Sequence, residues 1–249
     1  MIVYPNAKIN IGLNVLNKRN DGYHELSSVF YPVSELFDIL EIITSDVFSF
    51  SSSGVPIAGN SNICIKAFNL LKADYDVGNV KIHLHKMIPI GAGLGGGSAD
   101  GAFVLKALNE LFELNLTNKQ LEKYALKLGA DCPFFIDNTP KYVEGIGEKM
   151  TAIDLDLSEF KLKFIFPVLH ISTTEAYELI IPDIPKHNLL DAIKHPIENW
   201  KEDVQNDFEV SAFAKHPQLE KMKANLYADG AIYASMTGSG SVIYGVLRK

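Results

Sequence analysis

One segment of the sequence has the composition of a phosphate-binding loop. PIGAGLGGGSADGA, residues 89–102, holds six glycines. Glycine loses more backbone freedom on folding than any other residue, so a run of this kind is costly to order. Backbone N–H groups that no side chain blocks can approach an anion closely, and a helix beginning near Ser98 would point its positive end at the same place. The segment therefore predicts a loop that binds nucleotide phosphates.

Two familiar phosphate-binding templates fit this loop poorly. The P-loop template requires a lysine where this chain has Gly97, counting from Gly91. The dinucleotide template matches at Gly91, Gly93 and Gly96, but it also needs an acidic residue that closes a second strand about 20 positions later, whereas Glu113 ends a predicted helix. A tight strand-to-helix turn without a ligand is the remaining alternative, and such turns rarely need six glycines. A nucleotide loop of another design is favoured.

The composition is that of an ordinary globular protein of 249 residues, enough for one large or two modest domains. The net charge of −7 argues against a nucleic-acid partner. No apolar run approaches the roughly 18 residues that a membrane span needs, and no secretion signal is visible at the N-terminus. Cys64 and Cys132 are isolated, which predicts reduced thiols and a cytoplasmic location. Only Arg19 and Arg248 offer guanidinium groups, so backbone dipoles, lysines and a metal ion would have to bind phosphate.

The elements that must position this loop read as a mixture of strands and helices. His83 and His85 lie on the polar face of a predicted strand and, lacking a third ligand, are expected to be solvated rather than to bind a metal. We expect Ser98 to cap the helix after the loop, with Asp100 in its first turn. The predicted strands are 8–15 (half-buried), 28–33, 37–43, 81–90, a hairpin over 141–153, one from 161, and two final strands joined by TGSGS; the predicted helices are 62–73, one from 98, 117–129 with a capping box, and one from 217.

The glycine-rich segment resembles the ATP loop of the GHMP kinases. Within that family, three further segments resemble the members that phosphorylate 4-diphosphocytidyl-2-C-methyl-D-erythritol: PNAKINIGLNVLNKRNDGYHEL at 5–26, GADCPFFI at 129–136 and MTGSGSVIYGV at 236–246. The DGYH stretch is the most specific part. The resemblance implies an α+β, two-domain GHMP kinase fold with the active site in the interdomain cleft. It places an N-terminal ATP-binding domain at 1–155 and a C-terminal domain at 156–249.

The resemblance also implies an activity and a set of site residues. The reaction would transfer the γ-phosphoryl group of ATP, with Mg²⁺, to the 2-hydroxyl of the cytidine diphosphate-linked polyol, a step of the non-mevalonate route to isoprenoids. Lys8 and Asp131 would be the catalytic pair. The other residues carried over are, for ATP, Asn62, Ile63, Lys86, Pro89, Ile90, Gly91, Ala92, Gly93, Leu94, Gly95, Gly96, Gly97, Ser98 and Ala99, and, for the cytidyl substrate, Asn10, Tyr23, His24, Phe30 and Tyr177.

These residue types suit phosphoryl transfer, which asks the protein mainly to align a hydroxyl and to stabilise charge. An aspartate can accept the hydroxyl proton, and a nearby lysine can keep that aspartate ionised. Pro133 is expected to make Cys132 extended, so that Asp131 would lie between a helix and a strand. Taken singly, Lys8 could be a solvated strand lysine, Asp131 a turn residue and Tyr177 a core aromatic. Their occurrence together with the glycine loop favours the site.

Two alternatives to this function stay open at the sequence level. The chain could be a GHMP kinase for another alcohol, such as homoserine, although DGYH argues against that. It could also be a catalytically silent binding protein of the same fold, although Lys8 and Asp131 argue for catalysis. Gly96 and Gly97 stand where many GHMP kinases carry serines, so we name no protein ligand for Mg²⁺, which the phosphates and water would mainly hold. The sequence does not indicate an oligomeric state.

Overall fold

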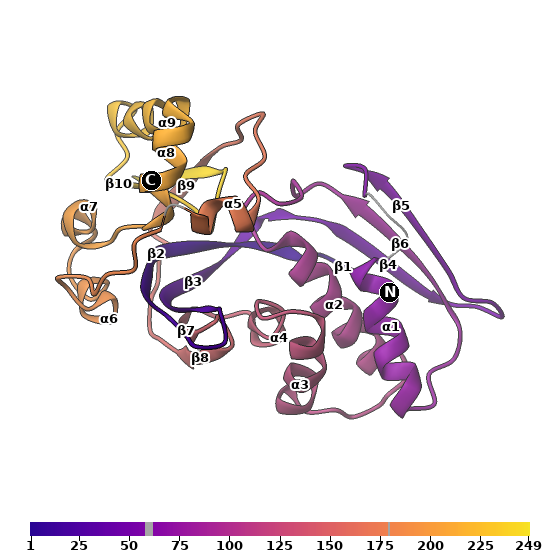
Figure 1. Ribbon diagram of the computed structural model, residues 1–249. Helices are drawn as coiled ribbons and strands as arrows, with labels where there is room; N and C mark the ends of the chain where they lie inside the picture. Colours follow the sequence, from indigo (N-terminus) through magenta and orange to yellow (C-terminus); the bar gives the residue numbers. More distant parts are fainter. Residues whose placement is uncertain (58–61, 179) are drawn as a thin grey trace. The chain divides into compact units, whose positions relative to one another are not determined.

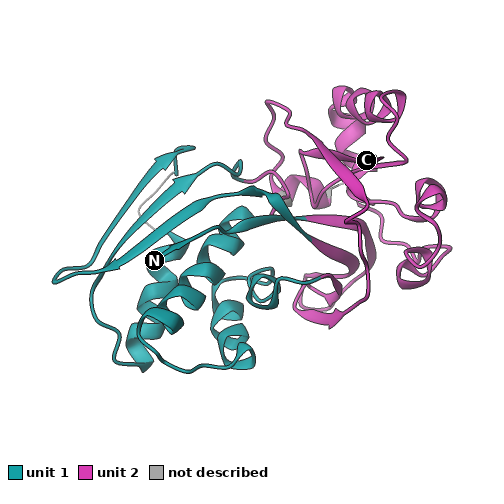
Figure 2. Ribbon diagram, turned by 180° about the vertical axis from the view of Figure 1, so that it is seen from behind, with its two compact units in different colours: residues 1–8, 32–90, 95–139 teal, residues 9–31, 91–94, 140–249 magenta. Residues whose placement is uncertain are grey.

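The computed structural model describes residues 1–57, 62–178 and 180–249, and this part of the chain divides into two compact units. Unit 1 comprises residues 1–8, 32–90 and 95–139, and unit 2 comprises residues 9–31, 91–94 and 140–249 (Figure 2). The chain therefore passes between the units several times, and the glycine loop contributes to both. The domain boundary near residue 155 stays a prediction.

Unit 1 is built on a four-stranded sheet with the strand order β1-β4-β6-β5. Its alternation puts Leu40, Ile42, Ile82 and Leu84 on the buried face. Helices α1, α2 and α3 pack against one another beneath the sheet (Figure 1). The elements are β1 Ile2–Val3, β4 Ile39–Thr44, β5 Ser49–Gly54, α1 Ile63–Asp74, β6 Val80–Lys86, α2 Gly96–Leu111, α3 Asn118–Leu128 and α4 Phe134–Asp137.

Two strands, β2 (Asn6–Lys18) and β3 (His24–Phe37), run through residues of both units. They belong to a second four-stranded sheet with the order β2-β3-β7-β8, in which β7 is Lys141–Gly145 and β8 is Lys149–Ala152. A turn at Asp21-Gly22 joins β2 to β3, where the Gly22 amide donates to Arg19 O. The predicted half-buried character of residues 8–15 is wrong, because the whole run from Asn6 to Val15 is buried.

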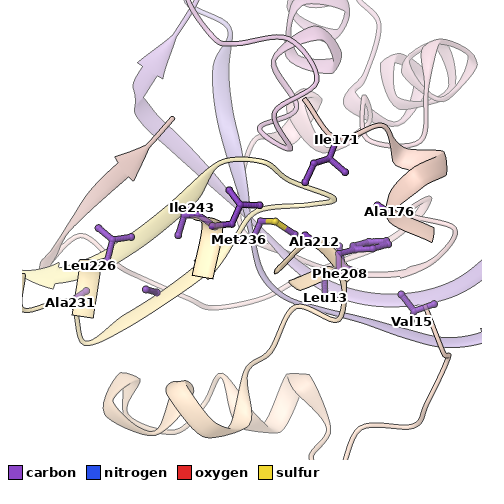
Figure 3. Packing of buried hydrophobic residues seen from close by; sticks show 12 residues of the cluster. Leu13, Val15, Ile171, Ala176, Phe208, Ala212, Leu226, Ala231, Met236 and Ile243 are labelled. Atoms are coloured by element: carbon purple, nitrogen blue, oxygen red, sulfur yellow. The ribbon is translucent and has the colours of Figure 1, made fainter. Parts of the chain in front are cut away.

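Unit 2 also contains a three-stranded antiparallel sheet, β10-β11-β9, whose core is shown in Figure 3. Met236 and Ile243 from this sheet pack with Phe208 and Ala212 from a helix and with Leu13 from β2. The predicted final hairpin and the helix from Pro217 are confirmed. The remaining elements are β9 Phe160–Ile165, α5 Thr173–Glu178, α6 Leu189–Ala192, a 3₁₀ turn at Ile197–Asn199, α7 Trp200–Asp203, α8 Phe208–Lys215, α9 Pro217–Ala228, β10 Tyr233–Met236 and β11 Ile243–Arg248.

The helix ends show which local predictions succeed. The predicted capping box of α3 is present: Thr117 and Gln120 satisfy each other's backbone N–H groups, and Gly129 ends the helix. Ser98, by contrast, is not a helix cap. Helix α2 begins two residues earlier, after Gly95, which has a φ of +69° and so lies in the left-handed region that glycine favours.

The chain after Asp131 also differs from the prediction. Residues 130–133 form a turn, and Pro133 leads into the short helix α4 instead of a strand. Proline is well tolerated at the start of a helix, where its missing N–H has no partner to lose. Phe134, Phe135 and Ile136 are all buried, and this packing holds the turn that carries Asp131. Among the described residues, none of the helices combines the length and apolar character that a bilayer crossing requires.

Candidate functional site

The predicted catalytic pair meets within unit 1. Lys8 Nζ lies 3.5 Å from Asp131 Oδ2. Lys8 comes from β2 and its side chain is 4% exposed, whereas the Asp131 side chain, from the turn before α4, is 35% exposed. Burial lowers the pKa of Lys8, and the charge of Asp131 and its hydrogen bond oppose that shift. The pair thus holds a buried cation against a carboxylate that reaches solvent.

The end of the glycine loop reaches the same place. A Cβ built on Gly95 would lie 3.0 Å from Lys8 Cγ and 3.0 Å from Phe135 Cζ, so the backbone passes directly over both side chains. Ser98, in the first turn of α2, hydrogen-bonds the thiol of Cys132, and this bond opposes the burial that raises the Cys132 pKa to about 11. The start of α2, Lys8 and the Asp131 turn are therefore packed as one group.

Neighbouring glycines of the loop face opposite ways. A Cβ on Gly96 would lie 2.7 Å from Ile88 Cγ2 and 3.0 Å from Lys86 Nζ, so this residue faces the protein interior. A Cβ on Gly97 would meet nothing within 4 Å, and Gly97 is exposed. The open side of the helix start is thus at Gly97. Across the loop, Ala92, Leu94, Gly96 and Ala99 are buried, Pro89, Gly93, Gly95 and Ser98 are half-buried, and Ile90, Gly91 and Gly97 are exposed.

Three residues were expected near the adenosine. Asn62 caps α1 by accepting a hydrogen bond from the Cys64 amide at 2.7 Å. Ile63 begins α1 and lies beside Gly101, where an added Cβ would be 2.9 Å from Ile63 Cγ1. Lys86 is 2% exposed, and its ammonium donates to Asp38 and Asp100. The side chains of Asn62 and Lys86 are thus engaged within the protein, and a role for them toward adenosine stays a prediction.

Within unit 2, the predicted substrate residue Asn10 is held by hydrogen bonds on both sides. Its side-chain amide donates to Ser28 Oγ at 2.8 Å, and its backbone N–H donates to Thr237 Oγ1 at 3.0 Å. The Thr237 hydroxyl in turn donates to Gly93 O in the glycine loop at 3.0 Å. A Cβ on Gly93 would lie 2.0 Å from Thr237 O, so only glycine permits this approach. Thr237 therefore joins Asn10 to the first half of the glycine loop.

The residues expected to hold cytosine are only partly gathered. The rings of His24 and Tyr177 stack with centroids 4.7 Å apart and planes at 19°. The Tyr177 ring also meets the ring of Phe208 edge-on, at 4.8 Å. Tyr23 is 61% exposed, and Phe30 is buried at 4% exposure. Burial and the charge of Lys18 lower the pKa of His24, so its imidazole is neutral near pH 7.

Sequence reasoning missed three residues that hold the loop: Asp38, Asp100 as a buried ion-pair partner, and Thr237. Asp38 lies between Glu35 and Glu41 in the segment SELFDILEII, and both glutamates are exposed, so the sequence does not single out Asp38 as the buried acid. The predicted place of Asp100 in the first turn of the helix is wrong, because α2 begins at Gly96 and its first turn holds no acidic residue. Thr237 lies in the TGSGS segment, which the sequence indicates only as the connection between two strands and as part of the family resemblance. No spacing rule connects these three positions to the loop.

Two family models match the chain. "GHMP kinases N terminal domain" matches residues 62–138, and "GHMP kinases C terminal" matches residues 187–249. A protein of Bacteroides thetaiotaomicron named 4-diphosphocytidyl-2-C-methyl-D-erythritol kinase is 50% identical, over 100% of this chain and 92% of its own length. A protein of Parabacteroides distasonis with the same name is 47% identical, again over 100% and 92%.

Solved structures of two kinases are also similar to this chain. A crystal structure of 4-(cytidine 5'-diphospho)-2C-methyl-D-erythritol kinase is similar with a TM-score of 0.86 and 33% identity, over 99% of this chain and 90% of that one. A homoserine kinase from Cytophaga hutchinsonii is similar with a TM-score of 0.69, over 98% of this chain and 86% of that one. Its identity of 17% supports a common fold alone.

Proposed function

The chain belongs to the GHMP kinase family, and from that premise we propose that it transfers the γ-phosphoryl group of ATP to the 2-hydroxyl of 4-diphosphocytidyl-2-C-methyl-D-erythritol. The substrate is supported by two relatives at 47% and 50% identity that carry the name of this kinase. It is also supported by a solved structure of the same named enzyme at a TM-score of 0.86.

The observation that carries the proposal is the convergence of Lys8, Asp131 and the end of the glycine loop within unit 1. Phosphoryl transfer needs a base or positioning group for the attacking hydroxyl and positive charge for the moving phosphoryl. Asp131, partly exposed, would accept or orient the hydroxyl proton. Lys8, buried beside it and under Gly95, would pair with Asp131 and stabilise the phosphoryl charge. A catalytically silent relative would have no need for this pair.

ATP is the co-substrate of this family, and we propose that it arrives with Mg²⁺. Among residues 1–57, 62–178 and 180–249, no group of three or more His, Cys, Asp or Glu side chains is arranged to hold a metal ion. We propose that phosphate oxygens and water mainly hold this Mg²⁺, as is usual for the ion with nucleotides. The ion would offset negative charge on the β- and γ-phosphates. The exposed Gly97 leaves room for phosphate at the N-terminus of α2.

The cytidine end of the substrate would meet aromatic side chains of unit 2. His24 and Tyr177 already stack, and a pyrimidine base can add to such a stack through its flat face. The neutral imidazole of His24 offers both a donor and an acceptor to the polar edge of a base. Beyond these two small-molecule substrates we propose no nucleic-acid or membrane partner. The net charge of −7 argues against binding to a nucleic acid. A cytoplasmic location is proposed from the two free, buried cysteines.

A coupled assay of ADP release tests this function against its alternatives. The protein is given ATP with the cytidyl substrate, homoserine, mevalonate or galactose in separate reactions. We expect turnover with the cytidyl compound alone. Turnover of homoserine or mevalonate without the cytidyl compound would place the chain among kinases of another alcohol. ATP binding without turnover of any alcohol would support the silent binding protein instead.

A further inference from the structure

A buried ion cluster in unit 1 joins the two ends of the glycine loop. It consists of Asp38, Lys86 and Asp100, and each of these side chains is at most 3% exposed. Lys86 Nζ donates to Asp38 Oδ2 at 2.5 Å and to Asp100 Oδ2 at 2.7 Å. The cluster therefore places one lysine between two aspartates at a depth where such side chains are rarely found.

Each member of the cluster stands at a boundary of the loop. Lys86 is the last residue of β6, immediately before the loop begins. Asp38 lies between β3 and β4, and its Oδ1 accepts hydrogen bonds from the first two loop amides, Met87 N at 2.5 Å and Ile88 N at 2.8 Å. Asp100 is on α2, the helix with which the loop ends. The segment from residue 87 to residue 95 is thus clamped at its start by Asp38 and at its end by Asp100.

The charges of the cluster are unusual for a purely structural contact. A Cβ on Gly96 would lie 3.0 Å from Lys86 Nζ, so the ammonium sits beneath the first residue of α2. A helix N-terminus carries positive partial charge and does not favour a neighbouring cation. Apolar residues of similar volume commonly replace a buried ion pair at no loss of stability. Asp100 Oδ1 also has no hydrogen-bond partner, which is rare for a buried polar atom.

We propose that Asp38, Lys86 and Asp100 are the positioning residues of the ATP loop, holding the entry of the loop and the start of α2 at the spacing that phosphate binding requires. This inference rests on the proposed ATP-dependent function. The three residues act through the loop backbone and need not touch the nucleotide. Displacing a binding loop by about 1 Å can reduce a reaction rate by on the order of 100-fold. Residues that hold both ends of the loop in place can therefore affect ATP binding and the reaction rate strongly.

The test compares two substitutions of Asp100 that differ in one hydrogen bond. Asp100→Asn keeps an oxygen that accepts from Lys86, whereas Asp100→Ala removes it and leaves Lys86 paired with Asp38. The affinity for ATP with Mg²⁺ is measured by calorimetry, and KM and kcat are measured for ATP and for the cytidyl substrate. We expect Asp100→Ala to weaken ATP binding and raise KM for ATP by about tenfold or more, with KM for the cytidyl substrate unchanged. Asp100→Asn should stay within about twofold of the wild type.

Leu121→Ala provides a control for general destabilisation. Leu121 is buried on α3, in the same unit but outside residues 87–95, and its truncation leaves a cavity that destabilises the fold. We expect its ATP affinity to match that of the wild type. The proposal is overturned if folded Asp100→Ala binds ATP normally, if Leu121→Ala weakens ATP binding equally, or if Asp100→Asn is as impaired as Asp100→Ala.

Two further outcomes separate this proposal from the proposed function. If Asp100→Ala does not fold, Asp38→Asn takes its place. Its amide oxygen can still accept hydrogen bonds from Met87 N and Ile88 N, while the charge facing Lys86 is lost. Normal ATP affinity in that variant would overturn the proposal. A wild type that binds ATP but phosphorylates none of the alcohols would contradict the proposed function, and the calorimetric comparison would still decide the role of the cluster.

Discussion

The imidazole of His24 stacks on the ring of Tyr177, with centroids 4.7 Å apart and planes at 19°. The two residues come from β3 and α5, which are far apart in the sequence, and the ring of Phe208 meets the Tyr177 ring edge-on. This packing supplies a flat aromatic surface in unit 2. It gives the proposed cytosine contact a definite place and a definite test.

Tyr177→Ala should raise KM for the cytidyl substrate about 10- to 100-fold, because one base–aromatic stack is worth on the order of 1–3 kcal/mol. KM for ATP should be nearly unchanged. Tyr177→Phe is the matched control, since it keeps the ring and should keep the low KM. Steady-state kinetics with each substrate varied in turn would check this. An unaltered cytidyl KM in folded Tyr177→Ala would remove Tyr177 from the site.

Gly96 and Gly97 should respond differently to the same substitution. Gly97→Val places a side chain in the open space at the helix start and should greatly weaken ATP binding with little change in stability. Gly96→Val forces its side chain against Ile88 and Lys86, so it should lower the free energy of unfolding by about 1–3 kcal/mol. Calorimetry with ATP and urea unfolding of both variants would separate the effects. Normal ATP affinity in Gly97→Val would mean that phosphate does not bind there.

The pKa of Asp100 predicts how stability depends on pH. Burial raises this pKa to about 8 in the folded protein; Lys86 opposes the shift and Asp38 adds to it. Burial and then the charge of Asp100 raise the pKa of the Cys64 thiol on α1. The unfolded value is near 3.8, so between pH 4 and 8 the folded state binds more protons at this position than the unfolded state does. The stabilisation that comes from protonated Asp100 is therefore full below pH 4. It declines as the pH rises from 4 and is lost as the pH passes through 8.

Urea unfolding of the wild type and of Asp100→Asn, at intervals from pH 5 to 9, would check this prediction. Asparagine resembles the protonated aspartic acid and does not titrate. The difference in unfolding free energy between the two proteins should therefore shift in favour of the variant as the pH rises, and should level off above about pH 8–9. A pH-independent difference would show that Asp100 keeps one protonation state throughout.

Much of the fold can be predicted from local sequence signals, but the candidate site can be predicted only in part. The α3 capping box, the Asp21-Gly22 turn and the helix from Pro217 depend on neighbouring residues, so their chemistry is visible in the sequence. Helix α2 begins before the predicted residue 98 because Gly95 packs on Lys8 and Phe135, which lie far away in the chain. The short helix α4 after Asp131 was likewise not predicted, because the burial of Phe134, Phe135 and Ile136 depends on the tertiary fold.

The glycine loop shows the limit most clearly. Its composition indicates close approach of the backbone to something, but not which glycine faces which neighbour. Gly93 approaches Thr237, Gly95 approaches Lys8, and Gly96 approaches Ile88. Among the glycines of residues 89–102, Gly97 alone faces open space, and nothing in the sequence distinguishes it from its neighbours. The buried partners of Lys86 were likewise invisible, because long-range ion pairs have no characteristic spacing.

The central claim is that Lys8 and Asp131 act as one catalytic unit, and a double-mutant cycle on kcat tests it most directly. Asp131→Asn keeps the shape of the side chain but removes its charge and basicity, so kcat should fall by about 10²–10⁴-fold with modest changes in either KM. Lys8→Met should be comparably severe. Because the groups lie 3.5 Å apart and serve the same transition state, the double variant should be little worse than the poorer single one. Near-full kcat in Asp131→Asn, or fully additive losses in the double variant, would contradict the account.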